Sequence, residues 1–130
     1  MQKKIRIVPL SLVLALCLSL SANAAVLRTK NNFTYSTDLS VSGNTATCYI
    51  SVTAKNAGPN AKISADFDLQ VKSGSGYNSI AGGHTSGSGS LSYQDPTTDS
   101  RISKGSIRMS YTITVTGSNG TDTVSGYVYG

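Results

Sequence analysis

Three segments of the chain alternate apolar and polar residues with a period of two. They run over 45–55, Lys62–Lys72 and Ser106–Thr116. In the second segment every odd position is apolar and every even position is polar or charged, as Phe67 and Asp68 illustrate. Successive side chains of a strand point to opposite sides of a sheet, so this pattern predicts strands with one buried and one solvated face.

Weaker strands are predicted at Phe33–Val41, Tyr77–Ala81, Ser90–Gln94 and Thr121–Tyr129. Between the strands lie runs of Gly, Asn and Ser, which accept the backbone angles of tight turns. These runs are Ser42–Asn44, Asn56–Asn60, Ser73–Gly76 and Gly117–Gly120. After residue 24, no apolar stripe of helical period runs for ten residues, so no helix is predicted there.

Three further segments are expected to be irregular. Ala81–Ser90 carries four glycines, and we interpret it as a mobile loop rather than a long strand. Asp95–Asp99 surrounds Pro96 and is expected to be a turn. Ser100–Gly105 is expected to form a corner with Ile102 as its inward anchor.

About seven short strands, each with one apolar face, indicate an all-β protein. Two antiparallel sheets packed face to face satisfy this pattern, as in the immunoglobulin-like and fibronectin-like β-sandwiches. A small barrel is the alternative.

The start of the chain has the features of an export signal. Lys3, Lys4 and Arg6 precede an apolar stretch at Ile7–Leu20, and Ala22-Asn23-Ala24 matches the small-x-small cleavage pattern. The apolar stretch is shorter than the ~20 residues that a membrane-spanning helix needs. We therefore expect a signal peptide at 1–24 and a secreted, extracellular domain at 25–130, with no membrane attachment after the signal is removed.

The charge balance argues against nucleic acid as a partner. The whole chain has 11 Lys and Arg against 6 acidic residues, a formal net charge of +5. Three of these cations lie in the predicted signal, which leaves a domain of +2 whose cations are scattered along the sequence. Nucleic-acid binding needs clustered cations, so this class of function is excluded.

Cys48 is the only cysteine of the predicted domain, so an intramolecular disulfide is ruled out there. It alternates with Thr47 and Tyr49 and shares the apolar phase of its strand with Ile50. We expect a buried thiol that packs as a small apolar side chain, with a reactive or intermolecular thiol as the alternative.

The residues suited to catalysis are few. The acidic residues are all Asp, and His84 is the only histidine. Asp66 and Asp68 share one strand face at about 7 Å, a spacing also found between glycosidase carboxylates. A small hydrolase using these two and His84 is an alternative, but we expect no enzyme, no cofactor and no metal site. Calcium binding by Asp95 and Asp99 is left open.

Tyr49, Tyr127 and Tyr129 fall on outward phases of their strands and are the candidate binding residues. Exposed tyrosines stack on sugar rings or anchor protein interfaces, although they also shield neighbouring strand residues. We expect a non-enzymatic binding or surface-interaction module whose ligand is an extracellular glycan or protein. A carbohydrate-binding or adhesive domain is the more specific alternative.

Four segments resemble a group of short secreted β-sandwich proteins from Gram-positive, largely gut-dwelling clostridia, classed as a domain of unknown function. The segments are Thr45–Thr53, Lys62–Tyr77, Gly87–Ser92 and Ser103–Met109. Cys48 matches a cysteine of this group, whereas Tyr77 stands at a position of Trp and Ile107 at a position of Tyr. The resemblance implies a secreted β-sandwich and no particular activity.

Overall fold

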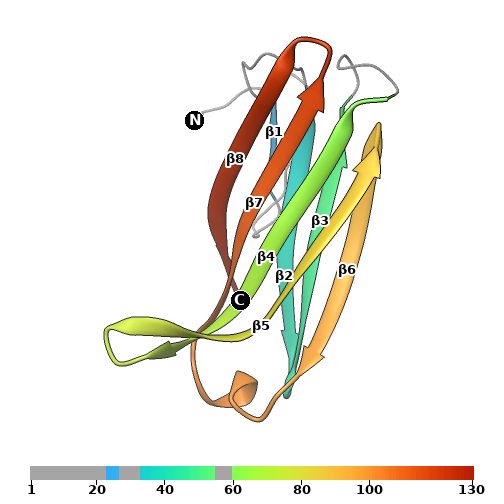
Figure 1. The fold of residues 1–130 in the computed structure, drawn as a ribbon. Helices are drawn as coiled ribbons and strands as arrows, with labels where there is room; N and C mark the ends of the chain where they lie inside the picture. Colours follow the sequence, from blue (N-terminus) through green and yellow to red (C-terminus); the bar gives the residue numbers. More distant parts are fainter. Residues whose placement is uncertain (1–22, 27–32, 55–59) are drawn as a thin grey trace, which may run out of the picture.

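The computed structural model describes residues 23–26, 33–54 and 60–130, which form two antiparallel four-stranded sheets. Sheet A has the order β1 (Asn23–Val26), β2 (Thr34–Ser42), β3 (Thr45–Thr53) and β6 (Ser90–Thr98). Sheet B has the order β5 (Gly76–Ser88), β4 (Lys62–Ser73), β7 (Ile107–Gly117) and β8 (Gly120–Tyr129). The sheets lie in two layers, and the β4–β5 hairpin extends beyond them (Figure 1). The predicted all-β sandwich is confirmed.

Among the described turns, three hairpins stay within one sheet, while the chain crosses between the sheets after β3, β5 and β6. The hairpins β2–β3, β4–β5 and β7–β8 turn at three of the predicted Gly-containing runs. A fourth run, Asn56–Asn60, lies largely outside the described residues. Between β5 and β6 the chain changes sheet at Gly89, whose φ of 76° favours glycine. Its backbone is hydrogen-bonded to Ala54 and Ala61 at the adjoining strand ends.

The apolar phases of the strands meet between the two sheets. Cys48 and Ile50 of sheet A, with Ile113 and Val115 of sheet B, are almost completely buried. The predicted burial of Cys48 is therefore confirmed. Ile102, in the short 3₁₀ helix η1 (Ile102–Lys104), is also buried, which confirms its predicted role as an anchor.

The prediction of a mobile loop at Ala81–Ser90 is wrong, because residues 81–88 belong to β5 and pair with β4. Two of the glycines there allow close approach of other groups. A Cβ at Gly83 would lie 2.5 Å from the Phe67 ring, and one at Gly87 would lie 2.8 Å from the backbone oxygen of Ser90. Gly83 and Gly87 share the inward phase of β5 with Ala81 and Thr85, so large apolar residues do not alternate with polar ones and the sequence pattern does not reveal this strand.

The predicted turn at Asp95–Asp99 is also wrong, since β6 continues to Thr98. Among the described strands, β6 lies at the edge of its sheet and hydrogen-bonds only to β3. Proline is tolerated on an edge strand because one side of that strand has no partner that needs its N–H. Pro96, which pairs in register with Thr47, therefore does not end the strand.

The predicted boundary between signal and domain falls inside β1. Asn23 and Ala24 pair with Thr37 and Ser36 of β2, and Ala25 and Val26 continue the same ladder. Cleavage after Ala24 would leave only two of the four β1 residues on the domain.

Replacing Gly83 by Ala is expected to destabilise the protein by about 1–3 kcal/mol, because the new Cβ overpacks the Phe67 ring. Gly76→Ala is the matched control, since no atom lies within 4 Å of a Cβ at this position. Urea unfolding of both variants measures the difference. Equal stability of the two variants would contradict the packing of β5 against Phe67.

Burial, reinforced by the nearby Asp95 carboxylate, raises the pKa of the Cys48 thiol from 9.0 to about 12. An unfolded thiol ionises above pH 9, whereas the folded one stays neutral, so this contribution to stability is present below pH 9 and lost as the pH rises towards 12. Between pH 8 and pH 10, the free energy of unfolding of the wild type should fall by about 1 kcal/mol more than that of Cys48→Ala. Urea unfolding at each pH measures this difference. The expectation would be contradicted if the free energy of unfolding changed equally with pH in the wild type and in Cys48→Ala.

Candidate functional site

The outer face of sheet B carries an arginine and several aromatic rings at one end. They gather where β4 ends, β5 begins, β7 begins and β8 ends. The strand register brings these four segments together, because Gln70 pairs with both Arg108 and Ser79, and Arg108 pairs with Tyr129. We call the following six residues the Arg108 cluster: Asp68, Gln70, Tyr77, Ser79, Arg108 and Tyr127.

Arg108 is the centre of this cluster and is held by three contacts. Its guanidinium carbon lies 3.6 Å from the centre of the Tyr77 ring and 4.1 Å from the centre of the Tyr127 ring. Its Nε donates a hydrogen bond of 2.7 Å to Oε1 of Gln70. The two tyrosines come from β5 and β8, the opposite edges of sheet B. Arg108 therefore joins both edges through attractive contacts between a cation and aromatic rings.

A short chain of hydrogen bonds fixes the amide of Gln70. Its Nε2 donates to Oδ2 of Asp68 at 2.8 Å, while the hydroxyl of Ser79 donates to Oδ1 of the same carboxylate at 2.5 Å. Asp68 thus sets the orientation of Gln70, and Gln70 sets that of the guanidinium of Arg108. Among the described residues, no carboxylate forms a salt bridge with Arg108.

Tyr127 and Tyr129 extend the cluster along β8. The two residues are 53% and 57% exposed, and their ring centres lie 6.4 Å apart. The intervening Val128 is buried, so the predicted outward phase of both tyrosines is confirmed. Tyr49 is half-buried and lies between the inward Cys48 and Ile50, on the outer face of sheet A. The structure therefore divides the three candidate tyrosines between opposite faces of the sandwich.

His84 and Asp66 meet on the same outer face of sheet B. Nδ1 of His84 lies 2.7 Å from Oδ1 of Asp66, and their side chains are 60% and 66% exposed. Asp68 is engaged by Gln70 and Ser79 instead. The structure thus brings together two of the three residues of the hydrolase alternative. Both side chains are largely exposed to solvent. Acid–base catalysis usually takes place in a cleft that excludes water, and these two residues do not lie in one.

Asp95 and Asp99 have different surroundings in the structure. Asp95 is half-buried on the inward phase of β6, opposite Cys48. Both carboxylate oxygens of Asp99 accept hydrogen bonds from the Arg101 side chain at 2.9 Å, and these bonds lower the pKa of Asp99 to about 2. Within residues 23–26, 33–54 and 60–130, no group of three or more His, Cys or acidic side chains is placed to hold a metal ion.

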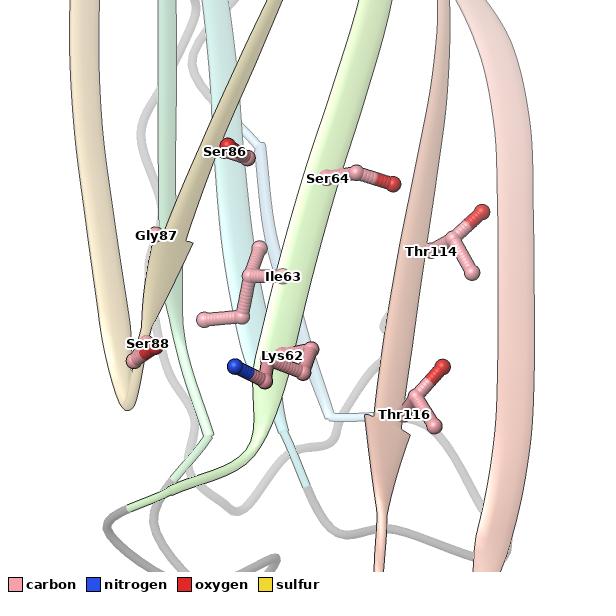
Figure 2. A pocket seen from close by; sticks show the side chains of 8 residues that line it. All are labelled: Lys62, Ile63, Ser64, Ser86, Gly87, Ser88, Thr114 and Thr116. Atoms are coloured by element: carbon pink, nitrogen blue, oxygen red, sulfur yellow. The ribbon is translucent and has the colours of Figure 1, made fainter.

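A shallow pocket of about 260 Å³ lies at the other end of sheet B. Figure 2 shows its residues on β4, β5 and β7, and most of them are hydroxyl-bearing. They are Lys62, Ile63, Ser64, Ser86, Gly87, Ser88, Thr114 and Thr116. Hydrogen bonds with Thr123 and Thr121 of β8 hold the hydroxyls of Thr114 and Thr116 in place. Small-molecule sites are usually deeper and more apolar than this pocket. We therefore describe it as a shallow, polar part of the surface.

Sequence reasoning identified Tyr127 and Tyr129 but missed the contacts of Tyr77 and Arg108. The outward phase of Arg108 was visible, since it lies between the apolar Ile107 and Met109. The strand order was not visible, and this order alone brings β5 and β8 to the same arginine.

Neither a protein-family model nor a curated protein matches the chain. The part of the chain that the structure describes contains no helix long and apolar enough to cross a membrane.

A double-mutant cycle of Tyr77→Ser and Arg108→Gln tests the contacts of the cluster. The coupling in the free energy of unfolding is expected to be about 0.5–1 kcal/mol, the range of a partly exposed cation–aromatic pair. The cycle of Tyr49→Ser with Arg108→Gln is the control, because these two residues lie on opposite faces, and it should show no coupling. Equal coupling energies in both cycles would contradict the direct contact between Tyr77 and Arg108.

Proposed function

We propose that this chain is an exported, non-enzymatic binding module that recognises an extracellular glycan or protein through the outer face of sheet B. The observation that carries the proposal is the arrangement of Tyr127 and Tyr129 beside an arginine without a carboxylate partner among the described residues. Tyrosine and arginine are the residue types on which binding energy concentrates in protein interfaces.

The order of the strands supports an immunoglobulin-like or fibronectin-like class. In such sandwiches, the third and sixth strands are neighbours in one sheet, and in the variable type an additional strand flanks the third. Setting β1 aside, β4 and β7 are the third and sixth strands, and β5 flanks β4. Export is supported by the sequence of residues 1–24.

The rigidity of the site favours binding. Arg108 is fixed by two rings and by Gln70, and all of these residues stand on paired strands. A ligand therefore meets side chains that are already ordered, and little conformational entropy is lost when it binds. The exposed Asp66–His84 pair keeps a small hydrolase as the alternative, which a turnover assay separates from binding.

The test is a binding screen of the purified domain against polysaccharides, mucins and cell-wall material. For a ligand found in the screen, Tyr127→Ser combined with Tyr129→Ser is expected to weaken binding at least about tenfold. Tyr49→Ser is the matched control, since it removes a tyrosine from the other face, and it should leave the affinity unchanged. Thermal unfolding should show that Tyr129→Ser stays within about 0.5 kcal/mol of the wild type.

Three results would contradict this proposal. The first is equal weakening by the control Tyr49→Ser. The second is a measured turnover that Asp66→Asn or His84→Ala abolishes while the tyrosine variants leave it intact. The third is a screen without any bound ligand.

A further inference from the structure

We propose that the Arg108 cluster binds a carboxylate-bearing polysaccharide, with the guanidinium pairing with the sugar carboxylate and the tyrosine rings packing against the sugar. This inference rests on the proposed binding function and specifies its ligand. Three observations carry it: the donors of Arg108, the charge around them, and the polarity of the whole face.

Arg108 offers donors that the described residues leave unused. A guanidinium has five N–H groups, and the described residues accept only the one on Nε, through Gln70. The Tyr77 and Tyr127 rings occupy positions next to the guanidinium carbon, which restricts the directions from which a ligand can approach. The remaining Nη groups suit a planar, two-oxygen acceptor, and a carboxylate provides one.

The charges around Arg108 favour an anion. Lys72 follows Gln70 on the same outward phase of β4 and is exposed, so this end of the face carries two cations. The carboxylate of Asp68 is the nearest opposing charge in the cluster, and it already accepts hydrogen bonds from Gln70 and Ser79. Further along the face, Asp66 is bonded to His84. The cations at this end are therefore only partly compensated.

The polarity of the face favours a sugar polymer over a peptide. Beyond the cluster, every outward position of β7 bears a hydroxyl: Ser110, Thr112, Thr114 and Thr116. A sugar presents hydroxyls to such a surface and apolar ring faces to Tyr127 and Tyr129.

Isothermal titration calorimetry of the wild-type protein with four polymers tests this inference. Polygalacturonate should bind, and its methyl ester, which lacks the charge, should bind at least about tenfold more weakly, like neutral amylose. Poly-L-glutamate has carboxylates without sugar rings and should also bind at least about tenfold more weakly.

Two charge variants locate the carboxylate site. Arg108→Gln should weaken the binding of polygalacturonate at least about tenfold, and Arg108→Lys should restore it only in part, because lysine keeps the charge but not the planar pair of donors. Lys62→Gln is the matched control: it removes one cation from the same face at the far end, and it should change the affinity less than about threefold. Circular dichroism confirms that each variant is folded.

Each contrary result has a distinct meaning. Equal binding of the methyl ester, or of poly-L-glutamate, would overturn the carboxylate–sugar inference and leave the proposed binding function standing. Equal losses for Lys62→Gln and Arg108→Gln would overturn it as well, because the protein would then be responding to overall charge. Failure of all four polymers overturns the inference, and only failure of the broader screen as well overturns the proposed function.

Discussion

The burial of one face of each sheet against the other is the interaction on which the rest of this structure depends. Because a strand alternates its side chains, burial of the odd positions of β7 forces the even positions outward. Ile107 and Met109 are buried, so Arg108 between them must face solvent. A one-residue shift of this strand would place the arginine in the core. The packing of the core thus fixes the chemistry of the outer face.

The same interface explains which strands the sequence could predict. β4 and β7 bury apolar residues at every second position, so their predicted and observed bounds agree within one residue. β5 fills its inward positions partly with glycine, because the Phe67 ring needs that space. The apolar partner of each such glycine stands on another strand, and a pattern within one segment does not contain this information.

The candidate site, too, could be predicted from the sequence only in part. The alternation along β8 was sufficient to place Tyr127 and Tyr129 outside, and it also placed Tyr49 outside on β3. It could not show that the first two share a face with Arg108 while Tyr49 lies on the opposite one. That depends on which strands are neighbours, and in sheet B the order β5-β4-β7-β8 joins segments from distant parts of the chain.

The central claim is that the core positions a binding surface at one end of sheet B. The most direct measurement is a titration of ¹⁵N-labelled protein with oligogalacturonate, followed by two-dimensional NMR. We predict that the largest shift changes occur at the backbone amides of Gln70, Tyr77, Arg108, Tyr127 and Tyr129, and that the amide of Tyr49 does not respond. Changes centred on the outer face of sheet A, or on His84 and Asp66, would contradict this account.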